Sequence, residues 1–187
     1  MYRNFFKRLF DIFFSFLVLV LVIPIILFFA ILVSFESKGP IFFLQLRMGI
    51  NGKSFTLYKL RSLKVNPNRK ENQIFNNHDD MTAVGKFIRR FKIDELPQIL
   101  NVLKGDMSIV GPRPCLPSLV EKFDENAFYR LKVKPGLTGW AQVNGNIHNS
   151  WPKRWEYDRD YVEQLSFSFD IKILFKTIFV ILLGEKK

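Results

Sequence analysis

One long apolar stretch lies near the start of the chain. No charged residue occurs from Ile12 to Phe35. These 24 residues would form a helix about 36 Å long, enough to cross a hydrocarbon core of about 30 Å. Pro24 lies at the middle of the stretch, and a proline inside a helix removes a backbone hydrogen bond and bends the axis. The pattern therefore predicts a membrane helix that is broken at Pro24.

The basic residues on either side of this stretch distinguish two topologies. Three basic residues precede it, and residues 38–70 contain eight basic side chains and no acidic one. Basic flanks prefer the cytoplasmic side of a membrane. A single spanning helix, the simplest interpretation of the length, would export one flank, whereas a re-entrant helix–break–helix keeps both inside. We therefore expect residues 1–37 to form a re-entrant, monotopic membrane anchor and residues 38–187 to form one cytoplasmic domain.

Two β-prone apolar runs flank an Asn-Gly pair at residues 51–52, which is a strong hairpin signal. The sequence therefore predicts a β-hairpin over residues 41–62. Side chains alternate along a strand, so Lys59 and Arg61 point to the same face near its end. Two cations there could bind a phosphate, and a solvated strand end is the alternative.

Helical spacing of apolar residues predicts further helices over residues 82–90, after Pro97, and from Ile171 to Leu182. Charged residues interrupt the last of these, so it is too polar to span a membrane. It is an amphipathic helix that lies in the membrane interface or packs on the core, and both alternatives stay open. The expected fold class is α+β, mostly helical: a monotopic membrane protein with a re-entrant segment, a β-hairpin and amphipathic interfacial helices.

Charge narrows the range of partners. The 187 residues include 28 Lys and Arg against 17 Asp and Glu, a formal net charge of +11. Such an excess favours a polyanionic partner, which could be nucleic acid, an anionic membrane surface or a phosphorylated substrate. The single cysteine, Cys115, excludes an internal disulfide.

Two adjacent carboxylates, Asp94 and Glu95, lie in a strongly basic part of the chain. Pro97 fits a helix only in its first turn, so both acids are expected at a helix start, where capping is their ordinary role. Four basic residues closely precede them: Lys86, Arg89, Arg90 and Lys92. Such surroundings would keep Asp94 ionised and attract phosphate. A carboxylate that attacks a phosphorus atom needs both conditions.

Arg113 lies between Pro112 and Pro114, so its backbone position is restricted. A rigidly placed guanidinium suits bidentate phosphate binding, and a structural turn with an exposed arginine is the alternative. A polar loop also contains a possible metal-binding group, His78, Asp79 and Asp80, although solvated side chains are the more frequent outcome in such a loop.

The chain resembles the bacterial sugar transferases, monotopic phosphoglycosyl transferases that act on polyprenyl phosphate. Five stretches carry the resemblance in the family's order and cover most of the chain. They are "KRLFD" (7–11), "RMGINGKSFTLYKLRSL" (47–63), "TAVGKFIRRFKIDELPQILNVLKGDMSIVGPRP" (82–114), "VKPGLTGWAQVNG" (133–145) and "YDRDYVEQLSFSFDIKIL" (157–174).

The resemblance implies transfer of a phospho-sugar from a UDP-sugar to undecaprenyl phosphate. The products would be a polyprenyl-diphosphate-linked sugar and UMP, which is the first membrane step in building a surface glycan or a glycoprotein oligosaccharide. It implies Mg²⁺ as cofactor, membrane lipids as partners and a location at the cytoplasmic face of the bacterial inner membrane. It identifies neither the sugar nor the oligomeric state.

The resemblance also implies roles for particular residues. Asp94 is implied to be a covalent nucleophile that forms a phosphosugar–aspartate intermediate. Glu95 is implied to assist as a metal ligand or as the base for the acceptor phosphate, so both carboxylates are expected near Mg²⁺. Arg89 and Arg113 are implied to bind phosphate.

Basic residues beside the re-entrant helix, Lys7 and Arg8, are implied to lie near the lipid head group. The chain departs from the family's usual pattern at three places, one of which is a mild change to "YKLRSL" (58–63) where the family often reads "YKFRSM". It has Ile23 where a serine often precedes the proline of the membrane helix, and Met81 where an arginine often precedes the threonine.

Three alternatives remain. A membrane-tethered nucleic-acid-binding protein would explain the charge, but two acids in the basic region would repel a phosphate backbone, so we expect no nucleic acid. A membrane-surface scaffold would leave the Asp94–Glu95 pair and Arg113 without a role. A glycosyltransferase that moves the sugar alone would release UDP rather than UMP.

Overall fold

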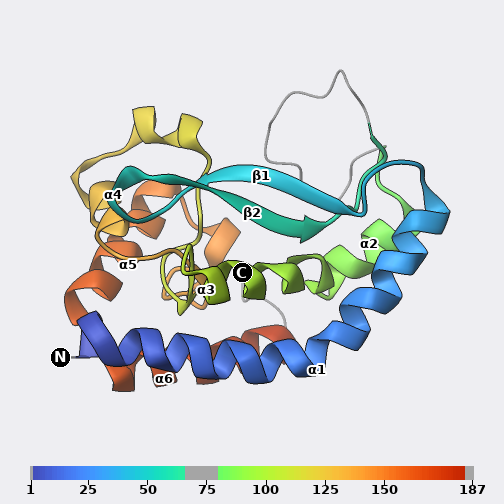
Figure 1. Ribbon diagram of the computed structural model, residues 1–187. Coiled ribbons are helices and arrows are strands. Elements are labelled where there is room, and N and C mark those ends of the chain that lie inside the picture. The colour runs from blue at the N-terminus through green and yellow to red at the C-terminus, as the bar shows by residue number, and fades with distance from the viewer. Residues whose placement is uncertain (1, 66–79, 184–187) are drawn as a thin grey trace.

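The structure is a computed structural model that describes residues 2–65 and 80–183. It is mostly helical with two small sheets (Figure 1), which confirms the α+β class predicted from the sequence. The helices are α1 (Lys7–Glu36), α2 (Ala83–Arg90), α3 (Ile99–Lys104), α4 (Glu125–Tyr129), α5 (Trp151–Gln164) and α6 (Phe167–Leu183). The strands are β1 (Phe42–Met48), β2 (Ser54–Leu60), β3 (Ser108–Val110) and β4 (Gly136–Thr138). Short 3₁₀ turns cover Ile50–Gly52, Ile93–Gln98, Pro117–Lys122, Arg130–Lys132 and Asn146–His148, and a π-helical turn covers Tyr2–Phe6.

The apolar stretch forms α1, which runs for 30 residues with Pro24 inside it. The expected break is wrong in one respect, because the helix is continuous through Pro24. Figure 1 shows instead that α1 bends, with its second part turned away from the direction of its first. A proline inside a helix causes such a bend because its ring displaces the preceding turn. Within the described residues, α1 is the helix that is long and apolar enough to cross a membrane.

The N-terminal end of α1 is held by the middle of the chain. Arg8 donates hydrogen bonds from Nη1 and Nη2 to the carbonyls of Val102 and Leu103, at 2.6 and 2.8 Å. These carbonyls belong to the last turn of α3, where carbonyls have few helical partners, although that of Val102 also accepts from the Gly105 amide at 3.0 Å. One turn along α1, Asp11 Oδ1 accepts hydrogen bonds of 3.0 Å from the Ser108 hydroxyl and from the Ile109 amide.

The C-terminal end of α1 is held by the same domain. Arg61 Nη1 donates to the carbonyl of Lys38 at 2.8 Å, just beyond the end of the helix. The Glu36 carboxylate accepts from the backbone amides of Ala83 and Val84 at 2.6 and 3.1 Å, where the start of α2 favours a negative charge. Both ends of α1 are therefore fixed to one folded unit.

The predicted hairpin is confirmed. β1 and β2 pair in antiparallel fashion, with Phe42 opposite Leu60. Asn51 and Gly52 have φ values of 55° and 72°, a left-handed conformation that asparagine and glycine adopt most readily. Leu57 and Leu60 on β2 are buried, so one face of β2 packs against the core.

The second sheet is a short parallel pair that positions the segment containing Arg113. Ser108 of β3 lies opposite Gly136 of β4. A Cβ atom on Gly136 would lie 2.1 Å from the amide nitrogen of Gly111, so the two backbones can approach only because this residue is a glycine. This close contact therefore fixes the position of residues 111–115, which follow β3.

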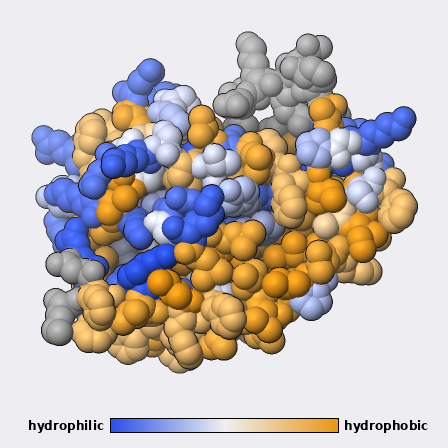
Figure 2. Space-filling model, viewed as in Figure 1, coloured by the Kyte–Doolittle hydropathy of each residue, from blue (hydrophilic) through white to orange (hydrophobic). Residues whose placement is uncertain are grey.

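The C-terminal helix α6 packs on the core along one face, as one of the two alternatives expected, and leaves its other face exposed. Ile173 is fully buried in the core, whereas Phe175 and Phe179 are each 60% exposed. Near its start, Phe167 lies against Phe10 of α1 with ring centroids 5.7 Å apart. Figure 2 shows an apolar band along the edge of the molecule where α1 and α6 run in Figure 1. Such a large exposed apolar surface is typical of contact with a membrane.

Candidate active site

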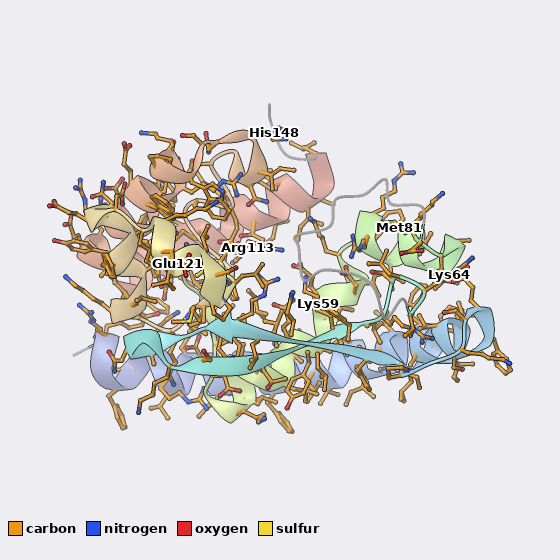
Figure 3. The ribbon with its side chains drawn as sticks, turned by 90° about the horizontal axis from the view of Figure 1, so that it is seen from above. Lys59, Lys64, Met81, Arg113, Glu121 and His148 are labelled. Atoms are coloured by element: carbon orange, nitrogen blue, oxygen red, sulfur yellow. The ribbon has the colours of Figure 1, made fainter. Side chains whose placement is uncertain are left out.

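A cavity of about 780 Å³ lies between the hairpin, α2, the Ile93–Gln98 turn, the segment after β3 and α5. Ten Lys and Arg side chains and three acids, Asp94, Glu95 and Asp158, line its described part. Figure 3 shows Lys59 near the centre of the molecule, with Arg113 on one side and Lys64 on the other. This excess of cations favours the binding of an anion.

The predicted carboxylate pair lies on the cavity wall. Asp94 and Glu95 are in the first turn of the Ile93–Gln98 3₁₀ helix, which leads into α3. The residue before this helix, Lys92, has a φ of 58°, a conformation that is rare for residues other than glycine. It reverses the chain after α2 and brings the two acids beneath the hairpin. The prediction that both acids start a helix is confirmed.

The Glu95 carboxylate is bound by two cations. Lys59 Nζ lies 2.7 Å from Oε1, and Arg113 Nη2 lies 2.6 Å from the same atom, with Arg113 Nη1 3.4 Å from Oε2. Burial alone would raise the pKa of Glu95, but Arg113 and Lys59 together hold that pKa well below its usual range. Glu95 is therefore a fixed anion that orients two cations.

Asp94 is 6% exposed, and its carboxylate accepts no hydrogen bond from any residue that the structure describes. Burial raises its pKa above the ordinary value, while the nearby Lys59, Arg89 and Lys92 oppose that rise. We expected the cations to dominate and to keep Asp94 ionised, but burial has the larger effect on its pKa. A carboxylate with few partners and a raised pKa is a more basic nucleophile than an exposed one.

The position of Arg113 is fixed by three consecutive backbone carbonyls. The carbonyl of Arg113 accepts from Arg130 Nη2, that of Pro114 accepts from Arg47 Nη1 at 3.3 Å, and that of Cys115 accepts from the Met48 amide at 2.9 Å. The buried Arg130, the half-buried Arg47 and the backbone of the hairpin thus hold the segment that carries the Arg113 side chain towards Glu95.

Arg130 and Asp158 were not identified from the sequence. Both are buried, at 7% and 2% exposure, and Arg130 Nη2 lies 3.5 Å from Asp158 Oδ2. Burial raises the pKa of Asp158 to about 6, although Arg130 and Arg154 lower it. One signal was present: Asp158 shares helical spacing with Trp155 and Val162, which are buried on the same face of α5. A charge on the apolar face of a helix needs a buried partner.

Several other predicted residues lie elsewhere or have additional contacts. Arg89 lines the cavity and donates from Nε to the Ser62 hydroxyl at 2.8 Å. Arg61 also borders the cavity, but its guanidinium binds carbonyls at the end of α1. Its role in phosphate binding stays a prediction that these contacts do not favour. Lys86 and Arg90 are exposed and do not line the described cavity.

Lys7 and Arg8 have structural contacts rather than the free positions expected for lipid-binding residues. Lys7 is 8% exposed. Its Nζ lies 2.8 Å from Asp170 Oδ2 and 3.5 Å from Asp11 Oδ1. Asp170 also accepts from the Tyr161 hydroxyl at 2.9 Å, and this buried group joins α1, α5 and α6. A buried ammonium with two carboxylate neighbours is not available to a lipid phosphate.

The carboxylates fit the way in which Mg²⁺ is usually bound beside phosphates. No group of three or more His, Cys, Asp or Glu is close enough to hold an ion among the residues described. His78 and Asp79 lie outside the described residues, and Asp80 does not line the cavity. Asp94 offers carboxylate oxygens that accept no hydrogen bond from the described part of the chain, and Mg²⁺ is typically held by one or two carboxylates together with substrate phosphates.

Comparison with known proteins gives a consistent result. The family described as "Bacterial sugar transferase" matches residues 2–184. The uncharacterized sugar transferase EpsL of Bacillus subtilis (strain 168) is 45% identical over 179 residues, which cover 96% of this chain and 88% of that protein.

Two longer relatives have more specific names. The UDP-glucose:undecaprenyl-phosphate glucose-1-phosphate transferase of Escherichia coli (strain K12) is 44% identical over 182 residues, which cover 92% of this chain and 39% of that protein. The UDP-N-acetylgalactosamine-undecaprenyl-phosphate N-acetylgalactosaminephosphotransferase of Aeromonas hydrophila is 42% identical over 187 residues, which cover 96% and 44%. The chain thus spans less than half the length of these two relatives. The family match over nearly all of its residues shows that the chain belongs to the bacterial sugar transferases.

Proposed function

We propose that the chain transfers a phospho-sugar from a UDP-sugar to undecaprenyl phosphate and releases UMP. The observation that carries this proposal is the buried Asp94 carboxylate, without a hydrogen-bond donor among the described residues, on the wall of a cavity lined by ten cations. The cations can hold a diphosphate, and the carboxylate is available as a nucleophile. The names of the Escherichia coli and Aeromonas relatives support this pair of substrates.

In the first step, the Asp94 carboxylate attacks the β-phosphorus of the UDP-sugar. A bond forms between a carboxylate oxygen and that phosphorus. The bond from this phosphorus to the oxygen that bridges the two phosphates breaks, and UMP leaves with the electron pair. The phospho-sugar remains on Asp94 as an acyl phosphate.

In the second step, a phosphate oxygen of undecaprenyl phosphate attacks the same phosphorus. The acyl-phosphate bond breaks, Asp94 regains its electron pair as a carboxylate, and a polyprenyl-diphosphate-linked sugar forms. Because the two steps use one nucleophile in turn, UMP can leave before the lipid reacts. This product would begin the assembly of a surface glycan or a glycoprotein oligosaccharide.

The neighbours of Asp94 neutralise and orient the phosphates. Lys59 uses one of its three N–H groups on Glu95 and can offer the others to substrate. Arg113, held through its carbonyl, presents its guanidinium beside Glu95 and can bind a phosphate at the same time. Asp94 and Glu95 would hold Mg²⁺, which would supply further neutralisation of the phosphate charge.

We also propose that α1 is a re-entrant anchor at the cytoplasmic face of the bacterial inner membrane. Both of its ends contact the same domain, through Arg8 and Asp11 at one end and through Glu36 at the other. A straight helix of 30 residues would separate its ends by about 45 Å, and the bend brings both towards the domain (Figure 1). The exposed apolar surfaces of α1 and α6 would then lie together in the lipid.

The proposal is tested by identifying the nucleotide product. The purified chain is incubated with a panel of UDP-sugars, Mg²⁺ and undecaprenyl phosphate, and nucleotides are separated chromatographically. We expect UMP with one or a few sugars. Release of UDP would support the sugar-only glycosyltransferase instead, and binding of nucleic acid without turnover would support the nucleic-acid alternative.

The covalent step is tested by leaving out the lipid. We expect a burst of UMP that does not exceed the amount of protein, and a gain in protein mass equal to one sugar phosphate on the peptide that contains Asp94. If UMP appears only when the lipid is present, the two substrates react directly and the covalent route is wrong.

A further inference from the structure

A row of aromatic rings leads from the membrane helix to Phe91, the residue before Lys92, which lines the cavity. Phe29 of α1 stacks on Phe87 of α2 with ring centroids 5.7 Å apart and an interplanar angle of 22°. Phe87 in turn contacts Phe91, just after α2, at 4.8 Å. Phe28 extends the row along α1, 5.2 Å from Phe29. We call Phe28, Phe29, Phe87 and Phe91 the aromatic strip.

The outer part of this strip is not needed for the core. Phe87 is 48% and Phe91 is 56% exposed. The opposite face of α2 makes the packing contacts, because Ile88 is fully buried and Gly85 lies against the backbone of Ser62. Two neighbouring half-exposed phenylalanines on a short helix leave apolar surface in water unless something covers it.

The strip ends at the cations beside the nucleophile. Lys92, which follows Phe91 directly, lines the cavity together with Arg89, and both cations act on the pKa of Asp94. Three peptide steps separate Phe91 from Asp94, so their Cα atoms lie within about 11 Å. The guanidinium of Arg90 lies 5.7 Å from the centre of the Phe91 ring, which places a further positive charge at this end. An apolar row therefore begins on the membrane helix and ends next to cations that line the cavity.

We propose that the aromatic strip binds the isoprenoid chain of the acceptor and directs its phosphate past Arg89 and Lys92 to Asp94. This inference rests on the proposed function, because it takes a polyprenyl phosphate as the acceptor. Such a substrate must keep its chain in the membrane while its phosphate reaches a buried carboxylate. The strip supplies apolar contacts along that path, and the cations at its end complement the phosphate charge. Ordinary phospholipid is the competing occupant of the aromatic strip. It would cover the rings without reacting at Asp94.

The test compares two acceptors in two matched double variants. Phe87→Ala/Phe91→Ala removes the outer rings of the strip. Phe175→Ala/Phe179→Ala removes two rings at the same spacing on α6, each 60% exposed, and serves as the control. The acceptors are undecaprenyl phosphate in detergent micelles and geranyl phosphate, a short water-soluble analogue. UMP formation without any acceptor reports separately on the first step.

We expect the strip variant to raise the KM for undecaprenyl phosphate about tenfold, because it removes apolar contacts with a long chain. Its KM for geranyl phosphate and its burst of UMP without acceptor should stay near those of the unaltered chain. The control variant should change neither KM. An unchanged KM for undecaprenyl phosphate, an equal rise for both acceptors, or an equal rise in the control variant would each overturn the inference.

A second measurement needs no variant. A polyprenyl phosphate with a photoreactive group on its third or fourth isoprene unit, beyond the length of geranyl phosphate, should label the peptide that contains Phe87 and Phe91, and unlabelled undecaprenyl phosphate should compete. If a photoreactive phospholipid labels this peptide equally and undecaprenyl phosphate does not compete, the strip binds ordinary lipid and the inference is wrong. Absence of any UMP from the unaltered chain would instead refute the proposed function.

Discussion

Asp94 and Glu95 are adjacent in the chain, but their carboxylates have opposite surroundings. Glu95 is bound by Lys59 and Arg113 at 2.7 and 2.6 Å, whereas Asp94 accepts no hydrogen bond from a described residue. Their pKa values accordingly move in opposite directions, below the ordinary value for Glu95 and above it for Asp94. Two carboxylates whose environments separate their pKa values are typical of sites that give them different roles. We assign nucleophilic attack to Asp94 and the orientation of cations to Glu95.

The first prediction concerns Asp94→Asn, which keeps the shape of the side chain but removes the anion. UMP formation should fall by at least about a thousandfold, or about 4 kcal/mol of transition-state stabilisation. Glu163→Gln, an exposed carboxylate on α5, is the control and should leave the rate unchanged. The assay is UMP release at saturating UDP-sugar. Near-normal release by Asp94→Asn would exclude the covalent mechanism.

The second prediction concerns pH. Because the pKa of Asp94 is raised, this residue still carries its proton at pH values where an ordinary aspartate is ionised. The reactive form is the anion, so the rate of UMP formation should fall as pH drops through this raised pKa. Lys59→Met removes the largest opposing charge and should move that acid limb to still higher pH.

The control for this experiment is Lys53→Met, which removes an exposed lysine at the hairpin turn. Its profile of UMP formation against pH should superimpose on that of the unaltered chain. If Lys59→Met lowers the rate equally at every pH, Lys59 contributes to substrate binding alone and does not set the ionisation of Asp94.

The third prediction separates the charge of Arg113 from its geometry. Arg113→Lys keeps the positive charge but cannot make two hydrogen bonds to Glu95 in one plane. A charge-assisted hydrogen bond is worth about 1.5–3 kcal/mol, so kcat/KM for the UDP-sugar should fall about tenfold or more. Full activity of Arg113→Lys would show that only charge matters at this position.

The sequence predicted local features better than contacts between distant residues. An uninterrupted apolar stretch was enough to identify α1, and an Asn-Gly pair was enough to identify the hairpin. The cations that contact the carboxylates were harder to identify from the sequence. Lys86 and Arg90 are close to Asp94 and Glu95 in the chain, but both are exposed. The two that bind Glu95, Lys59 and Arg113, come from 36 and 18 residues away.

Such long-range pairs depend on how the hairpin and β3 pack, and no local periodicity encodes them. The same reason explains Lys7, which the family pattern associates with lipid. Its position at the membrane end of α1 suggested a lipid contact, and only the packing of α6 against α1 brings Asp170 within 2.8 Å of it. The sequence alone also could not predict that α1 continues through Pro24, because a proline can either bend a helix or end it.

The fourth prediction concerns the pair that supports Arg113. Arg130 contacts both the Arg113 carbonyl and Asp158, so Asp158→Asn should misplace Arg113 and lower kcat about tenfold at neutral pH. Asp158 has a pKa of about 6, so it becomes neutral, like asparagine, as pH falls below that value. The ratio of the two rates should therefore approach one in acid. Asp160→Asn, a partly exposed neighbour on α5, is the control.

A constant ratio at all pH values would mean that the Asp158 charge does not act through Arg130. In that case Arg130→Lys should also have little effect, since the Arg113 carbonyl would be held by other contacts. The thermal unfolding midpoint, measured alongside, shows whether either variant has lost its fold.

The last prediction concerns topology. Both ends of α1 are fixed to one domain, through Arg8 and Glu36 among others, so both should lie in the cytoplasm. We would introduce Arg3→Cys or Lys38→Cys, both exposed positions, into a Cys115→Ser background that removes the native cysteine. An impermeant thiol reagent should label neither site in intact cells and both sites after the cells are opened.

Labelling of Arg3→Cys alone in intact cells would mean that α1 spans the membrane. Pro24→Ala tests what holds the re-entrant form, because it restores the missing backbone hydrogen bond and favours a straight helix of about 45 Å, long enough to cross. The contacts at both ends of α1 and the basic residues before it oppose that crossing. We therefore expect a minor fraction of Pro24→Ala molecules to expose Arg3→Cys outside, and a larger fraction when Arg8→Ala is added, since this second change frees the N-terminal end from α3. If the double variant keeps the labelling pattern of the unaltered chain, neither the bend nor the Arg8 contact sets the topology, and the remaining flanking charges are sufficient.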